Sequence, residues 1–168
     1  IAQGMDPSEV LRGVDEVKKL TGHTQLGLDL MPDLAKISTA TGADIGDIGS
    51  LAGNIIAGNQ KDGKTTISNA DILKQVRIFT QQGIVGGVEV NDFAKLGSRL
   101  TAGAGIFTGD KQENAATLGA FAQVARQQGG AATPAEAVMA AQRFASSTQQ
   151  HAGKLKSDFD IDVKAGDG

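Results

Sequence analysis

Apolar side chains return every three or four residues along most of the chain, which is the spacing of one face of an α-helix. The pattern is clearest between Gly83 and Ala145, where three apolar stripes are separated by glycine-rich turns. Each stripe needs a partner surface to cover it. The side chains expected to be buried in these three helices are Phe93, Leu96 and Leu100, then Leu118, Phe121, Ala122 and Ala125, and finally Ala137, Val138, Ala141 and Phe144.

Four more helices are expected before this region. The first ends at Gly22, the second begins near Met31 with Pro32 in its first turn, the third follows Gly42, and the fourth runs from Ser68 to Gln82 before Gly83. Their expected buried faces are Val10, Leu11, Val14, Val17 and Leu20; Leu30, Leu34 and Ile37; Ile45, Ile48, Leu51, Ala52, Ile55 and Ile56; and Ile72, Val76 and Phe79.

Polar residues mark the expected helix ends. A side-chain oxygen at the first position accepts a backbone N–H that has no partner inside the helix. Thr133 and Glu136 have the spacing of a capping box, with Pro134 at the first helical position. Gly129 can take the left-handed conformation that closes the preceding helix. The candidate N-caps are Asp6, Asp44, Ser68 and Thr133.

These patterns predict an all-α fold, a compact domain of about seven short helices joined by glycine-rich turns. The chain has 168 residues, which is enough for one sizeable core. We expect one helical domain over residues 1–150 and a polar tail over residues 151–168 that leads into a longer chain. Phe79, Phe93, Phe107 and Phe121 are spaced every 14 residues in different expected elements, which favours a shared core over a ligand site.

The polar tail alternates acidic and apolar residues at Asp158, Asp160 and Asp162. Strict alternation predicts a short half-buried β-strand near the C-terminal end of the sequence. A calcium loop is the alternative, since it also has Asp at its first, third and fifth positions. Such a loop needs Gly at the sixth position, where this chain has Val163, and Glu at the twelfth.

Charge and composition argue against several function classes. Sixteen Lys and Arg against nineteen Asp and Glu leave a net charge of −3, and the basic residues are scattered, which disfavours nucleic-acid binding. The chain has no cysteine, and its two histidines, His23 and His151, are far apart in the sequence. No grouping of catalytic residues emerges from the sequence. We therefore expect a protein that is not an enzyme and that uses no cofactor or metal.

The segment from Gly58 to Thr65 suggests a second interpretation, a phosphate-binding loop. Its glycines, Lys64 and Thr65 match the phosphate-binding loop pattern G-x-x-x-x-G-K-[ST]. In that reading backbone N–H groups hold phosphates, Lys64 contacts the terminal phosphates and Thr65 binds magnesium. A phosphate loop follows a β-strand and enters a helix at its lysine, whereas here a helical stripe precedes it and the next helix starts near Ser68. A solvated turn is the competing interpretation.

The region from Glu89 to Phe144 resembles the globular helical domain in the N-terminal part of phage tail tape measure proteins. The likeness consists of the turn Glu89, Asp92, Phe93, Ala94, Lys95; the helix Leu118, Gly119, Ala120, Phe121, Gln123, Ala125, Arg126; and a Gly-Gly turn followed by the helix capped by Thr133. The matched core spans roughly half of the chain. The resemblance implies no catalytic residue.

The resemblance implies a structural and assembly protein of a phage or phage-like tail, located in the virion tail after assembly in the host cytoplasm. Its implied partners are copies of itself in a homo-oligomer of three, tail tube and tail tip or baseplate proteins, and tail assembly chaperones. A helical adaptor with no viral connection is a further alternative. The expected interaction residues are Ile84, Val85, Phe93, Ile106 and Phe107, several of which should be exposed in an isolated copy.

Overall fold

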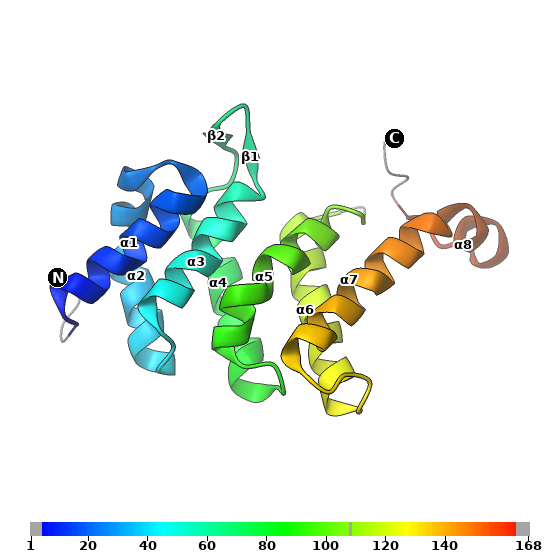
Figure 1. Cartoon of the computed structure of the whole chain (residues 1–168). Coiled ribbons are helices and arrows are strands. Elements are labelled where there is room, and N and C mark those ends of the chain that lie inside the picture. Colours follow the sequence, from blue (N-terminus) through cyan, green and yellow to red (C-terminus); the bar gives the residue numbers. More distant parts are fainter. Residues whose placement is uncertain (1–4, 108, 164–168) are drawn as a thin grey trace. The chain divides into compact units, whose positions relative to one another are not determined.

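The computed structural model describes residues 5–107 and 109–163, and within them the fold is all-α, as the sequence predicts. Eight helices and one short two-stranded hairpin are described (Figure 1). The helices are α1 (Pro7–Thr21), α2 (Thr24–Thr41), α3 (Ile45–Ala57), α4 (Asn69–Val85), α5 (Val90–Ala104), α6 (Lys111–Gln127), α7 (Pro134–Gln150) and α8 (Ala152–Phe159), and the strands are β1 (Gln60–Lys61) and β2 (Lys64–Thr65).

The chain divides into two compact units, the first running to Ser98 and the second beginning at Arg99. The boundary falls inside α5. The first unit contains α1 to α4 and the β-hairpin, and the second contains α6 to α8. The sequence led us to expect one helical domain over residues 1–150.

The first unit is built on the close approach of α1 and α3. A Cβ on Gly49 would lie 2.6 Å from the backbone oxygen of Gly13, so the two helices pack backbone against backbone at this point. On either side of it, every apolar residue expected to be buried in α3 is buried, from Ile45 to Ile56. Leu30, Leu34, Ile72, Val76 and Phe79 add α2 and α4 to the same core.

The second unit has a smaller core between α6 and α7, made mostly of alanine. Small side chains let the two helices lie close together, and a few larger residues fill the remaining space. Gly103 in the last turn of α5 contributes to it, because a Cβ there would lie 3.1 Å from Leu118 Cδ1. The buried apolar residues of α6 and α7 are Ala115, Leu118, Ala122, Ala137, Val138, Ala141 and Ala145.

The expected N-caps are confirmed. The carboxylate of Asp44 accepts hydrogen bonds from the N–H groups of Gly46 and Asp47. Ser68 Oγ accepts from the N–H of Asp71 at 3.2 Å. Thr133 and Glu136 form the complete capping box. At Asp6, hydrogen bonds from the Ser8 hydroxyl and then from its N–H lower the pKa of the carboxyl group.

Two helices are longer than the sequence predicted. α2 begins at Thr24 and keeps Pro32 in its interior, because the upstream turns are anchored: Leu30 is buried and Gly27 lies against the backbone of Val14. α4 continues to Val85 through Gly83, which was expected to end it. A Cβ at Gly83 would lie 2.6 Å from the backbone nitrogen of Val90, so this glycine permits close packing within the unit instead of terminating the helix.

The C-terminal strand expectation is wrong for the described residues. Residues 152–159 form α8, and Asp160 follows with a left-handed backbone, φ 54°. Lys156 Nζ lies 2.8 Å from Asp160 Oδ1 and 3.9 Å from Asp162 Oδ2. The two acidic residues therefore form ion pairs with a lysine at the end of α8. The rest of the expected tail, residues 164–168, lies outside the described residues.

Some stripe residues expected in the core are exposed instead. In α1, Val14 and Val17 are buried but Leu11 and Leu20 are not. In the second unit, Phe121 and Phe144 are 38% and 48% exposed. The helical period therefore identified the correct faces, but the packed part of each face is narrower than the stripe.

Candidate interaction site

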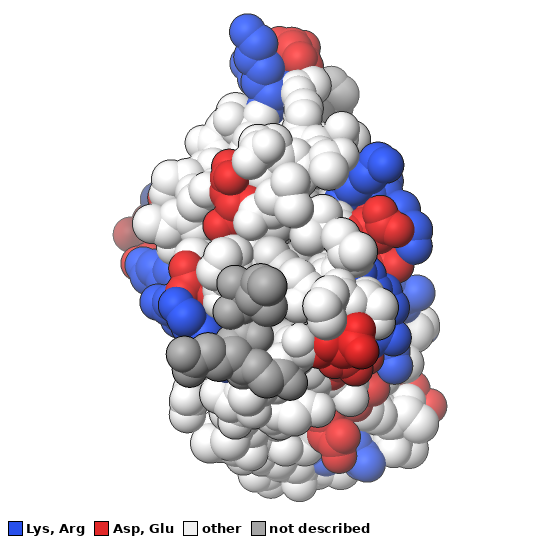
Figure 2. All heavy atoms as spheres, turned by 90° about the vertical axis from the view of Figure 1, so that its left-hand side faces the viewer, with Lys and Arg blue, Asp and Glu red and all other residues white. Residues whose placement is uncertain are grey.

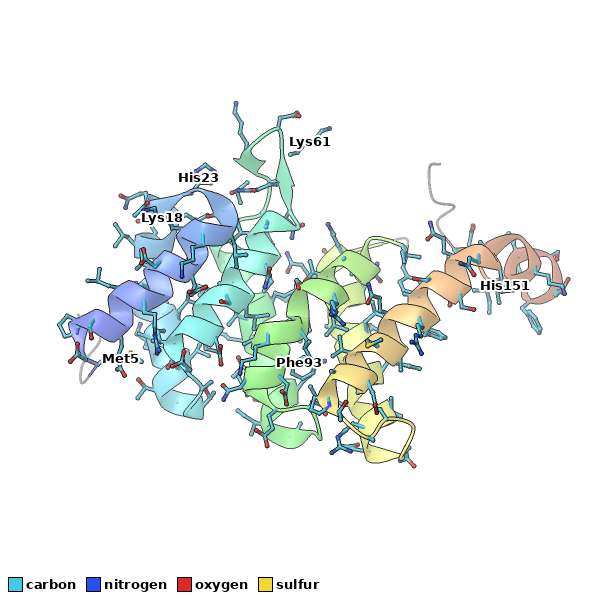
Figure 3. All side chains as sticks on the ribbon, viewed as in Figure 1. Met5, Lys18, His23, Lys61, Phe93 and His151 are labelled. Carbon is cyan, nitrogen blue, oxygen red and sulfur yellow. The ribbon has the colours of Figure 1, made fainter. Side chains whose placement is uncertain are left out.

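The structure places the five expected interaction residues in three different environments. Ile84 and Val85 end α4 and are 57% and 69% exposed. Ile106 and Phe107 follow α5 and are half-buried. Phe93 is completely buried in the first unit, where its ring lies 5.4 Å from that of Phe79 (Figure 3). Phe93 is therefore a core residue, because its helical stripe is covered, and its side chain is not available to a partner.

Ile84 lies beside a surface hollow of about 490 Å³ in the first unit. We call it the α2–α4 hollow, because the C-terminal ends of both helices contribute to it. The close contact between Gly83 and Val90 brings the first turn of α5 against the end of α4 and so forms one wall. The lining residues are Thr41, Gly42, Ala43, Gly83, Ile84, Gly86, Glu89, Val90 and Asn91.

The second unit carries a more apolar depression, of about 310 Å³, which we call the aromatic groove. The rings of Phe121 and Phe144 line it and stack on each other, with centroids 4.8 Å apart and an interplanar angle of 16°. Asn114 Nδ2 donates to the backbone oxygens of Ala104 and Phe107, both at 3.4 Å, and so fixes the segment that follows α5. The lining residues are Phe107, Asn114, Thr117, Leu118, Phe121 and Phe144, none of which is charged.

Sequence reasoning found Phe107 but missed Phe121 and Phe144 as surface residues, since both lie on apolar stripes. The signal that separates them is the alanine content of the neighbouring positions. Ala115, Leu118 and Ala122 already form a complete i, i+3, i+7 contact with α7, which leaves the larger Phe121 at the edge. Val124, one turn further along α6, is 54% exposed and extends the same apolar surface.

The phosphate-binding interpretation of Gly58 to Thr65 is not compatible with the local geometry. Lys61 and Lys64 are paired in an antiparallel hairpin, and Asp62 and Gly63 both have positive φ, 51° and 71°, as in a two-residue type I′ turn. Gly58 caps α3, and α4 begins only at Asn69. The segment thus leaves a helix and contains no strand-to-helix turn that could hold phosphates.

Each of the two histidines lies close to a backbone oxygen. His23 Nε2 lies 3.2 Å from the backbone oxygen of Gly63, at the end of the first unit where Figure 3 also shows Lys61. His151 Nδ1 lies 2.8 Å from the backbone oxygen of Ser147. Among the described residues, no three His, Cys, Asp or Glu side chains are grouped so that they could hold a metal ion. No described helix is long and apolar enough to cross a membrane.

Charged side chains of both signs are interspersed on the face that includes α1 and α2 (Figure 2). No broad area of one sign is visible there. Comparison with protein-family models, with curated proteins and with solved structures finds no match to this chain. The candidate sites therefore rest on the geometry of the chain itself. They are a hollow with polar and apolar lining residues in the first unit and an apolar depression in the second.

Proposed function

We propose that this chain is a structural and assembly segment of a tail tape measure protein from a phage or phage-like particle. In this role the parent polypeptide occupies the tail lumen or tip and sets tail length by its own extent, at about 1.5 Å per helical residue. The chain performs no reaction. Its task is to hold exposed apolar surfaces in position for docking.

The order of the resembling segments supports this proposal. Glu89 directly precedes α5 and Asp92 lies in its first turn, the segment Leu118 to Arg126 lies in α6, and the Thr133 capping box begins α7. A sequence likeness whose blocks coincide with successive helices and with their caps is stronger than the same letters scattered over unrelated elements. This coincidence is the observation on which the proposal mainly rests.

The aromatic groove gives the proposal a physical basis. Phe121 belongs to the resembling segment, and its ring is partly exposed beside Phe144. Partly exposed aromatic residues around an uncharged depression are typical of protein docking surfaces. The partners that this role entails are further copies of the chain in a trimer, tail tube proteins, tip or baseplate proteins, and assembly chaperones.

The test requires the particle itself. Assembled tails would be purified from host cells that produce the polypeptide containing this chain, and their peptides would be identified by mass spectrometry. The double variant Phe121→Ser, Phe144→Ser should lower the yield of assembled tails at least about tenfold, because it removes an aromatic anchor. Phe159→Ser is the matched control, since Phe159 is 69% exposed and lies outside the groove.

Two results would contradict the proposal. One is the absence of peptides from this chain in purified tails. The other is an equal yield of tails from the groove variant and from the Phe159→Ser control, with both chains folded by circular dichroism.

A further inference from the structure

We propose that the α2–α4 hollow binds a segment of another polypeptide that presents a lysine or arginine side chain beside apolar residues. The inference deepens the proposed function, on which it rests, by naming the chemistry of one docking partner. It concerns the first unit alone and does not involve the aromatic groove. The residues that carry it are Ile84, Val85, Glu89 and Asn91.

We expect the hollow to have a negative potential, because helix ends and a carboxylate contribute to its lining. The C-terminal turns of α2 and α4 both contribute to its lining, and each helix C-terminus carries a partial negative charge. Neither helix has a basic residue in its last turn, whereas α1 has Lys18 and Lys19 there and α6 has Arg126. These two helix ends therefore lack the cationic side chains that usually balance them.

Residues at the start of α5 add to this potential. Glu89 is exposed at the hollow and forms no ion pair with a described residue. Asn91 also lines the hollow, and its buried Oδ1 has no hydrogen-bond partner among the described residues. The N-terminus of α5, which carries a partial positive charge, also lies at the hollow. Asp92 in the first turn of α5 and Glu89 just before it offset this positive charge.

The apolar part of the binding surface lies at the end of α4. Ile84 and Val85 are 57% and 69% exposed, although they end a helix that buries Ile72, Val76 and Phe79 in the core. Two adjacent exposed β-branched residues next to a negative hollow favour a ligand with both an apolar and a cationic portion. A basic side chain would enter the hollow while its apolar neighbours cover Ile84 and Val85.

Other occupants fit less well. A metal ion would find one carboxylate at the hollow, and hard cations prefer several. A second copy of the chain offers Arg12 beside Leu11 and Lys19 beside Leu20, but Arg12 is paired with Asp44 and Lys19 with Glu16. Arg143 lies beside Phe144, which lines the aromatic groove, a different docking surface in the proposed function. A different polypeptide is therefore the occupant we infer.

Hexylguanidinium and hexylurea form a matched pair of probes, because they differ chiefly in charge. The backbone amide resonances of the complete chain would be followed by NMR as each probe is added. Hexylguanidinium should shift the amides of Gly42, Ala43, Gly86 and Asn91 and should bind at least about fivefold more tightly than hexylurea. Glu89→Gln should remove that difference, whereas Glu113→Gln, an exposed acid on α6, should leave it unchanged.

Several outcomes would overturn the inference. Equal affinities for the two probes, or no shift at these amides, would show that charge does not select the ligand. Shifts with calcium chloride but not with hexylguanidinium would assign the hollow to a metal ion. Shifts of the same amides on raising the protein concentration without any probe would assign it to a second copy. None of these results bears on whether the chain is present in a tail.

Discussion

Two pairs of phenylalanines show how differently the two units use the same residue type. In the first unit, Phe79 and Phe93 are completely buried, with ring centroids 5.4 Å apart and tilted by 33°. In the second, Phe121 and Phe144 stack at 4.8 Å but remain 38% and 48% exposed. The first pair holds a core together, whereas the second lies on a surface, and only the second can contribute to docking.

The difference follows from what surrounds each pair. The first unit buries many isoleucine and leucine side chains, and α3 alone buries Ile45, Ile48, Leu51, Ile55 and Ile56. The second unit joins α6 to α7 mainly through alanine, which leaves no deep interior for a large ring. An aromatic ring at the edge of a helix pair becomes buried only when another protein surface binds there.

The largest expected effect is the loss of one ring from the buried pair. Phe79→Ala should destabilise the first unit by about 3–5 kcal/mol, because it removes a buried aromatic side chain and leaves a cavity. Phe144→Ala is the matched variant in the second unit. It should lower the free energy of unfolding clearly less, because the side chain of Phe144 is 48% exposed. Guanidinium unfolding followed by circular dichroism would measure both, since the chain has no Trp or Tyr for fluorescence. Similar losses of stability in the two variants would contradict the proposed difference between the buried and the exposed phenylalanine pair.

A smaller effect is expected from adding one methyl group to a glycine. Gly49→Ala should destabilise the first unit by about 1–3 kcal/mol, because its Cβ would lie 2.6 Å from the backbone oxygen of Gly13. Gly103→Ala in the second unit meets only the end of the Leu118 side chain, at 3.1 Å, which can rotate away. Hydrogen exchange across α1 and α3 should rise in the Gly49 variant alone. Equal destabilisation by Gly49→Ala and Gly103→Ala would mean that the first unit is not packed more tightly at Gly49 than the second unit is at Gly103.

The smallest effect is local to the first turn of α1. Hydrogen bonds from Ser8 lower the pKa of Asp6 below its ordinary value of 3.8. The folded chain therefore gains stability from the charged carboxylate above pH 3.8, and loses that contribution as the pH falls through the lowered pKa. Asp6→Asn, which keeps the cap but cannot titrate, should have a slightly lower Tm than the wild type near pH 6. The difference in Tm should close as the pH falls through the lowered pKa of Asp6. A difference that does not change with pH would contradict the lowered pKa.

Sequence patterning accounts for most of the helices and for their N-caps. The stripe of α3 and the Thr133 capping box required only local spacing, and the structure confirms both. Helix ends that depend on neighbours were not predictable in this way. Gly83 continues α4 because Val90 approaches it closely, and no local pattern distinguishes that glycine from a helix terminator.

The candidate surfaces were less predictable than the fold. The exposure of Ile84 and Val85 agrees with the expectation from their glycine-rich context. Phe93 was expected both on a buried stripe and among the interaction residues, and it lies in the core. The aromatic groove depends on how closely α6 and α7 approach, which is set by alanines distributed over both helices. The charge of the α2–α4 hollow depends on two helix ends that lie far apart in the sequence.

The most direct test is hydroxyl-radical labelling of phenylalanine rings in the free chain and in purified tails. We predict that Phe121 and Phe144 are labelled in the free chain and protected at least about fivefold in the tail, because docking covers the aromatic groove. Phe79 and Phe93 should stay unlabelled in both states, since they are buried in the chain itself. Equal labelling of Phe121 and Phe144 in the free chain and in the tail would contradict the proposed docking role.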